Sequence, residues 1–235
     1  GFTKIPFTIF YSLKILRLKI CRVPVFAGLT VMISACAATT HLPRHHMIAA
    51  ANPLASEAGR KMLRDGGSAI DAAIAAQMVL TLVEPQSSGI GGGAFLMHFS
   101  KKVWKVEAYD GRETAPATIR PHIFLNNEGK RRAFGDISRG GAAVGVPGVV
   151  RMLALAHRDH GKLPWARLFK PAIELAENGF AVSPRLNAMI KRAKDLKEFP
   201  AARTYFYTRS GDPLPTGHHL YNPDLADTLR RIATD

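Results

Sequence analysis

The strongest hydrophobic pattern in the chain is an alanine-rich segment, residues 69–83, in which nearly every side chain is apolar. A helix that is apolar on all faces belongs in the interior of a protein. Ser68 and Asp71 have the spacing of a capping box, which predicts that the helix begins at residue 69. Glu84 and Pro85 follow and end it. We therefore predict a buried helix over residues 69–83.

Other apolar segments have helical spacing and are bounded by glycine or proline. Ser56 is the expected N-cap of a helix that ends at Arg64, just before Gly66-Gly67. Four more helices are expected towards the C-terminus, and the last two have proline in the first turn. Their expected ranges are residues 149–160, 164–178, 184–199 and 223–233.

Two strands are expected between these helical segments. Residues 94–99 form a short apolar run, and residues 103–109 alternate between apolar and polar side chains, as does a strand with one solvated face. The link over residues 100–102 predicts that they form a hairpin. A loop-rich stretch then extends to Gly148. Helices, a hairpin and further helices together predict an α+β layered fold, whose sheet we expect to be completed by residues beyond this chain.

Composition indicates an ordinary globular protein, because 47% of the 235 residues are hydrophobic and 21% are charged. The net charge of +14 is unevenly distributed: residues 1–46 contribute six lysines and arginines and no acidic residue. Basic clusters at residues 130–132 and 191–194 are not interleaved with aromatic side chains, so we interpret them as solvated surfaces and not as a nucleic-acid site.

The first 46 residues have the features of an export signal. A basic stretch precedes about eleven apolar residues, 23–33, which is too few for a membrane span of about twenty. The Ile33-Ser34-Ala35-Cys36 ending is similar to the lipobox of bacterial lipoproteins, although Ile33 stands where leucine is favoured. We expect an exported, periplasmic protein, lipidated at Cys36. The alternative is an ordinary secretory signal in which Cys36 has no role. Because the sequence begins with Gly1, we expect that the true start lies elsewhere.

Residues 47–235 contain no cysteine, which excludes disulfides and cysteine-based metal sites there. His157 and His160 are three residues apart on an expected helix, but the H-E-x-x-H spacing is absent and no third ligand is evident. We interpret them as surface histidines near a helix C-terminus, and His218-His219 as part of a turn. We predict no metal site.

The glycine run 89–93, followed by Ala94, formally matches G-x-G-x-x-A, the sequence fingerprint of dinucleotide-binding sites. The fingerprint requires a strand before it and a helix after it, and here the expected order is reversed. A close-packed turn that enters a strand is the better interpretation. Ser87 and Ser88 lack the G-x-S-x-G pattern of a serine hydrolase.

The glycine run also precedes the motif Arg112-Glu113-Thr114-Ala115-Pro116 by about twenty residues. Together with residues 52–59, 85–93 and 144–148, this motif resembles the large subunit of gamma-glutamyltranspeptidases, also called glutathione hydrolases. The resemblance covers residues 47–235 and implies that Arg112 binds the α-carboxylate of a γ-glutamyl group, through a fork that fits a carboxylate. We expect this arginine to be buried. The alternative is a structural salt bridge to Asp110 or to a neighbour of Glu113.

The resemblance further implies part of a four-layer αββα fold of the N-terminal-nucleophile hydrolases. In that family a precursor cleaves itself, and the exposed threonine of the small subunit attacks the γ-glutamyl amide. The glutamyl group then passes to water, an amino acid or a peptide, without a cofactor. No catalytic residue is expected in this chain, and Thr39-Thr40-His41, similar to the start of a small subunit, is treated as coincidence.

We therefore expect residues 1–46 to be a signal or lipoprotein-type segment and residues 47–235 to be the truncated large-subunit portion. The implied partners are γ-glutamyl compounds such as glutathione, acceptor amino acids or peptides, and a small subunit from the same precursor or a split gene. The chain alone is expected to be inactive. The alternative function is a non-catalytic, lipid-anchored binding or scaffold protein derived from the enzyme.

Overall fold

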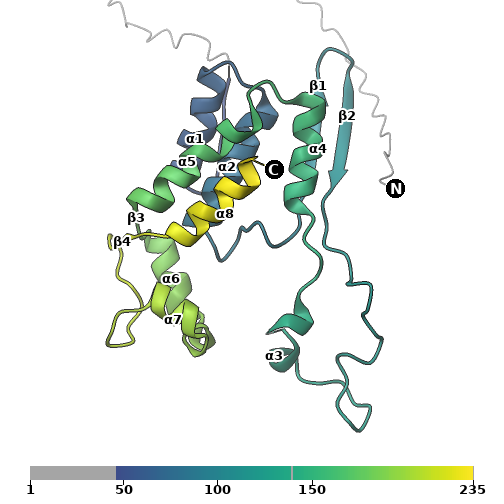
Figure 1. Ribbon diagram of the computed structural model, residues 1–235, viewed down its shortest axis with the longest axis vertical. Coiled ribbons are helices and arrows are strands. Elements are labelled where there is room, and N and C mark those ends of the chain that lie inside the picture. The colour runs from purple at the N-terminus through teal and green to yellow at the C-terminus, as the bar shows by residue number, and fades with distance from the viewer. Residues whose placement is uncertain (1–45, 139, 235) are drawn as a thin grey trace, which may run out of the picture.

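The computed structural model describes residues 46–138 and 140–234. The predictions for the N-terminal export segment, including Cys36 and Thr40, therefore concern residues 1–45, which lie outside the described residues. Helices dominate the described elements, which also include the hairpin β1–β2 and a second antiparallel pair of short strands, β3 and β4 (Figure 1). In chain order the elements are α1 (Pro53–Arg64), α2 (Ala69–Val83), β1 (Phe95–Ser100), β2 (Lys105–Asp110), α3 (Phe134–Ile137), η1 (Gly141–Ala143), α4 (Val149–His160), α5 (Trp165–Asn178), β3 (Phe180–Ala181), α6 (Pro184–Arg192), η2 (Lys194–Glu198), α7 (Pro200–Phe206), β4 (His219–Leu220) and α8 (Pro223–Thr234).

Helix α2 is the centre of the core, as its apolar sequence predicts. Eleven of its fifteen residues are buried, and it packs against α1, α4 and α5. Figure 1 shows α1, α2, α5 and α8 grouped together, with α4 and the hairpin β1–β2 beside them. The capping box of Ser68 and Asp71 is present in both directions, so the predicted start of this helix is confirmed.

Asp71 also fixes the start of α2 to the loop between α4 and α5. Its carboxylate is fully buried, and its Oδ2 accepts hydrogen bonds from the backbone N–H groups of Ser68 (2.7 Å), Lys162 (3.0 Å) and Leu163 (3.2 Å). These donors offset the cost of removing a carboxylate from water. The network therefore positions α4 and α5 relative to the central helix.

The predicted hairpin is confirmed, with β1 and β2 paired antiparallel from Phe95 opposite Asp110 to Ser100 opposite Lys105. The second strand begins two residues later than expected because Trp104 has a positive φ of 49°, which places it in the turn. Side chains alternate between an inner face, which includes His98 and Tyr109, and an outer face. Phe95, Met97 and Phe99 form the outer face and are 67%, 75% and 51% exposed.

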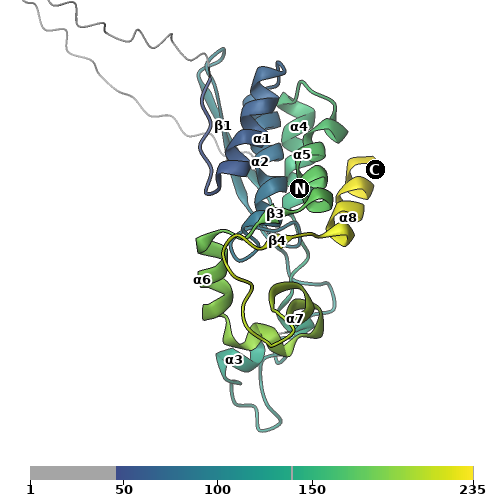
Figure 2. The ribbon, with the colours of Figure 1, turned by 90° about the vertical axis from the view of Figure 1, so that its left-hand side faces the viewer.

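Residues 111–148 form a long connection between β2 and α4. It extends away from the helical core, and its described residues, 111–138 and 140–148, contain only α3, η1 and isolated bridges (Figure 1). Figure 2 shows α3 at the same end of the molecule as α6 and α7. This connection agrees with the loop-rich stretch that the sequence predicts, and it returns the chain to the end of the hairpin.

Several assignments differ from expectation, and the expected bounds of β1, α5 and α8 are each displaced by one residue. Asn52, not Ser56, caps α1: its Oδ1 accepts from Leu54 N at 3.0 Å, while Ser56 Oγ accepts from Ala50 N at 3.1 Å. The helix predicted over residues 184–199 ends at Arg192 and continues as η2. His219 lies in β4 and not in a turn. The expected bounds of α2 and α4 are confirmed. Within the described residues, no helix combines the length and apolar character needed to cross a membrane.

Candidate active site around Arg112

The glycine run and the arginine motif meet at the open end of the hairpin. Gly111 N donates to Ala94 O at 2.9 Å, and Ala94 N donates to Gly111 O at 3.3 Å. These two bonds continue the strand pairing one residue beyond Phe95 and Asp110. The end of the glycine run thus lies against the residue that precedes Arg112.

A third segment, residues 144–148, closes the arrangement. Thr114 and Val146 form an isolated antiparallel bridge, with Val146 N donating to Thr114 O at 2.8 Å. Gly148 N donates to Gly92 O at 3.1 Å, immediately before α4 begins. Three of the segments that carried the family resemblance are therefore linked by hydrogen bonds, although they are far apart in the sequence.

Arg112 projects from this junction into solvent. Its backbone N–H donates to Asp110 Oδ1 at 2.9 Å, which fixes the turn after β2. The side chain is 70% exposed, so the expectation of a buried arginine is wrong for the described residues. The physical reason is that a guanidinium is costly to bury without a matched anion, and Glu113, the carboxylate with which it forms an ion pair, is itself 38% exposed.

The salt bridge of Arg112 is too weak to explain the residue. Its Nε lies 3.5 Å from Glu113 Oε2, and both side chains are solvated. Exposed pairs of this kind contribute about 0–1 kcal/mol to stability. An incoming carboxylate can therefore displace Glu113 at little cost, and the guanidinium is accessible for bidentate binding.

A buried polar network supports the start of the glycine run, and the sequence reasoning missed it. Glu84, only 2% exposed, accepts from Asn52 Nδ2 (3.0 Å) and Gln86 Nε2 (2.6 Å) and pairs with Arg185 Nε (3.0 Å). It thereby joins the start of α1, the end of α2 and helix α6. The signal available in the sequence was a glutamate directly after an apolar helix, which we interpreted only as a helix end.

The serines of this segment are structural in the described residues. Ser88 Oγ accepts from Gln77 Nε2 at 2.8 Å, and Ser87 Oγ accepts from Arg185 Nη2 at 3.3 Å. The glycine run follows a helix and precedes a strand, as predicted, which is the reverse of a dinucleotide site.

The two histidines of α4 point to different partners. His157 Nε2 lies 2.8 Å from Leu163 O, and His160 Nε2 lies 2.8 Å from Glu107 Oε2. Their side chains are 19% and 22% exposed, so the interpretation of both as surface histidines is wrong. His160 meets Glu107 and His98 from the hairpin in a cluster with metal-ligand chemistry. Sequence reasoning missed His98 and Glu107, because only the hairpin register brings them together.

Burial perturbs two titratable groups near this cluster. The pKa of His98 is lowered by burial and by the neighbouring His160. Burial and a hydrogen bond to Asp159 Oδ2 at 3.1 Å raise the pKa of Tyr109. At neutral pH His98 is therefore an uncharged imidazole and Tyr109 a phenol.

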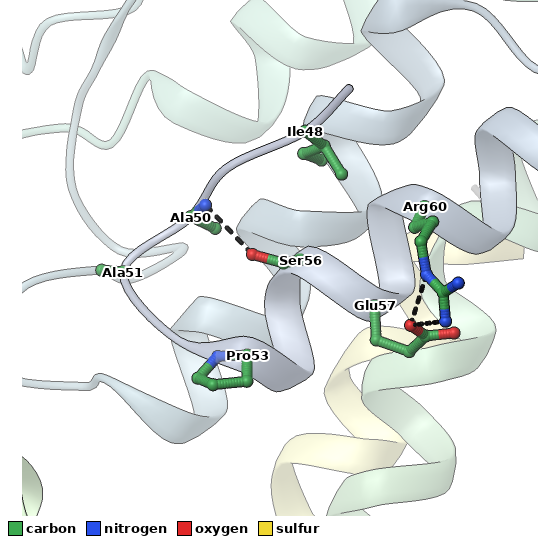
Figure 3. A pocket seen from close by; sticks show the side chains of 7 residues that line it. All are labelled: Ile48, Ala50, Ala51, Pro53, Ser56, Glu57 and Arg60. Carbon is green, nitrogen blue, oxygen red and sulfur yellow. Dashed lines mark hydrogen bonds and ion pairs between the residues drawn. The ribbon is translucent and has the colours of Figure 1, made fainter. Parts of the chain in front are cut away.

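An open depression of about 560 Å³ lies at the start of α1 (Figure 3). Within it the guanidinium of Arg60 is bound by Glu57 of the same helix. Because these charges satisfy each other, a charged ligand would have to displace one of them. Arg112 does not line this depression, whose residues are Ile48, Ala50, Ala51, Pro53, Ser56, Glu57 and Arg60.

The convergence of these motifs at Arg112 agrees with comparisons to known proteins. A family model described as gamma-glutamyltranspeptidase matches residues 55–235. The chain belongs to the gamma-glutamyltranspeptidase family. It is 43% identical over 189 residues to glutathione hydrolase 3 of Arabidopsis thaliana and 41% identical over 186 residues to the glutathione hydrolase proenzyme of Bacillus subtilis.

These alignments cover 80% and 79% of this chain but only 28% and 32% of the two relatives, so the chain spans about a third of their length. Among solved structures, the gamma-glutamyltranspeptidase of Helicobacter pylori superposes with a TM-score of 0.76 at 34% identity, covering 81% of this chain and 54% of that chain. The enzyme from Pseudomonas nitroreducens gives 0.73 at 33% identity, with 81% and 55% coverage. The predicted fold class is confirmed: the chain has part of the α+β fold of the N-terminal-nucleophile hydrolases.

Proposed function

We propose that residues 47–235 form the large-subunit portion of a gamma-glutamyltranspeptidase and that Arg112 binds the α-carboxylate of the γ-glutamyl substrate. The observation that carries this proposal is the solvent-facing guanidinium of Arg112, held at a junction of three family motifs. A bidentate pair with a carboxylate would hold the substrate by the end that all γ-glutamyl compounds share and leave the γ-amide for the nucleophile.

The proposed substrates are glutathione and related γ-glutamyl compounds, by analogy with relatives named glutathione hydrolases. The proposed reaction is acyl transfer. A threonine hydroxyl on the small subunit attacks the γ-carbonyl, and the amine leaves. Water or an acceptor amino acid or peptide then takes the glutamyl group. Arg112 takes no part in bond making; it orients the substrate.

The outer face of the hairpin supports the proposal of a second polypeptide. Phe95, Met97 and Phe99 alternate along one strand and are exposed, an arrangement that normally packs against another layer. We propose that the small-subunit segment, which carries the nucleophile, packs against this face.

The proposed function is tested with a chromogenic γ-glutamyl anilide. The 235-residue chain alone should give no turnover above the uncatalysed rate, because loss of the nucleophile costs several orders of magnitude. Co-expression with a segment that begins with the family's Thr-Thr-His should restore turnover, and changing the first threonine of that segment to alanine should abolish it.

Two results would contradict this function. Normal turnover by the chain alone would place the nucleophile within it and direct attention to Thr40. A genuine stop codon in the adjoining DNA, with no turnover in the complex, would favour the non-catalytic scaffold instead.

The N-terminal segment supports export to the periplasm with a lipid anchor at Cys36. Acylation should place the protein in the membrane fraction, and a labelled fatty acid should be incorporated. Cys36→Ser should block labelling, whereas Cys21→Ser is the matched control and should not. An unlabelled periplasmic product whose N-terminus lies away from residue 36 would remove the anchor but leave secretion intact.

A further inference from the structure

Three separate elements bring His98, Glu107 and His160 together beneath the hairpin. His98 of β1 lies directly opposite Glu107 of β2 in the strand register, so both side chains share the inner face. His160 is the last residue of α4 and lies against that face. One ligand atom from each residue lies within 4.8 Å of the others.

The contacts within this cluster are close. His160 Nε2 is 2.8 Å from Glu107 Oε2, and the rings of His98 and His160 stack with centroids 3.9 Å apart at 26°. Their surroundings are largely shielded from water, with the Glu107 and His160 side chains 17% and 22% exposed. The possible ligand atoms thus lie close together in a site that is partly shielded from water.

One atom of the cluster is not satisfied by these contacts. His98 Nδ1 is buried and has no hydrogen-bond partner among the described residues. Leaving a buried polar atom without a partner costs about 1–3 kcal/mol, and a bound ion would remove that cost by coordinating the nitrogen.

We propose that His98, Glu107 and His160 bind a divalent transition-metal ion such as Zn²⁺. Two imidazoles and one carboxylate match zinc, nickel or copper, whereas Mg²⁺ and Ca²⁺ prefer all-oxygen ligands. In a tetrahedral zinc site with bonds near 2.0–2.1 Å, ligand atoms are about 3.3 Å apart. To reach this geometry, side-chain rotations would have to separate the stacked rings and lengthen the Glu107–His160 contact.

The ion would brace α4 against both strands of the hairpin. Strand β2 leads through Asp110 directly to Arg112, so the same brace would stiffen the support of the proposed substrate-binding residue. This role is structural and does not depend on the γ-glutamyl reaction. The competing interpretation is a histidine–carboxylate pair with a second histidine stacked on it, which binds no metal.

Zinc titration of the full chain tests the proposal. The parent for all measurements carries Cys21→Ser and Cys36→Ser, which removes the thiols of the N-terminal segment as competing ligands. ZnCl₂ is added to metal-free protein and followed by calorimetry. We expect one saturable site that depends on the cluster, and a zinc-induced rise in the melting temperature. MgCl₂ should produce neither.

Variants then locate the site. Loss of an outer-shell partner typically weakens metal binding about 10–100-fold, so loss of a direct ligand should weaken it at least about tenfold. We expect such a loss for His98→Ala, His160→Ala and the near-isosteric Glu107→Gln. His122→Ala, which changes an exposed histidine in the long connection, is the matched control and should bind as the parent does.

Circular dichroism of each metal-free variant shows whether it is folded, and Glu107→Gln provides a test if either alanine variant is not. Absence of a saturable zinc site in the folded parent would overturn the proposal. It would also be overturned if folded Glu107→Gln and His160→Ala bound zinc with the parent's affinity, since the ligands would then lie elsewhere.

Discussion

Replacement of Arg112 by glutamine in the completed enzyme should raise the KM for γ-glutamyl substrates at least about tenfold. A charge-assisted hydrogen bond is worth about 1.5–3 kcal/mol, and about 1.4 kcal/mol corresponds to a factor of ten in affinity. Arg112→Lys should lie between wild type and Arg112→Gln, because lysine keeps the charge but loses the planar fork. Steady-state kinetics with a γ-glutamyl anilide measure the effect.

Self-cleavage of the precursor should be unaffected in both variants, because it requires no bound γ-glutamyl carboxylate. Arg151→Gln, at an exposed position on α4, is the matched control for loss of one surface arginine and should leave the KM unchanged. If Arg112→Gln had the wild-type KM, or if it failed to fold or to self-cleave, Arg112 would be a structural residue.

Gly148→Ala should destabilise the protein by about 1–3 kcal/mol, the usual cost of forcing an extra group into a packed site. A Cβ at this position would overlap the carbonyl group of Gly111 and approach the backbone of Arg112. Its own backbone, with φ −116° and ψ −15°, is open to alanine, so the cost is steric. Urea unfolding of the 235-residue chain measures the loss of stability.

Relief of the same overlap should displace Arg112, so Gly148→Ala should also raise the KM of the completed enzyme. Gly141→Ala is the matched control, because a Cβ there meets no atom within 4 Å. It should leave the unfolding midpoint and the KM close to those of the wild type. Equal midpoints for Gly148→Ala and Gly141→Ala would show that the packing between residues 111 and 148 does not restrict the site.

The parts of the fold that could be predicted from sequence are those determined by nearby residues. Helix α2 was predictable in extent and burial, because its cap, its composition and the following proline all indicate the same structure. Helix α4 was predictable because Gly148 and Gly161 bound it. The arginine motif identified Arg112 as a binding candidate without any structure.

The features that could not be predicted depend on contacts between distant segments. The helix expected over residues 184–199 ends early, where the Tyr207 hydroxyl donates to the Ala193 carbonyl at 3.3 Å. The exposure of Arg112 depends on which segments surround the hairpin end, and motif spacing contains no such information.

The same limitation explains the polar clusters. Glu84 acquires its role only when Asn52 and Arg185 come to it from other helices. The His98–Glu107–His160 cluster requires both the hairpin register and the docking of α4. A search of the sequence for metal ligands on one helix pairs His160 with His157. In the structure His160 lies with His98 and Glu107 of the hairpin instead.

The central claim is that Arg112 binds the substrate α-carboxylate, and a comparison of two substrates tests it most directly. Wild-type and Arg112→Gln enzymes are assayed with a γ-glutamyl anilide and with the same anilide whose α-carboxylate is a primary amide. If the two groups contact each other, the substitution lowers kcat/KM at least about tenfold for the acid but less than about twofold for the amide. An equal loss on both substrates would contradict the claim.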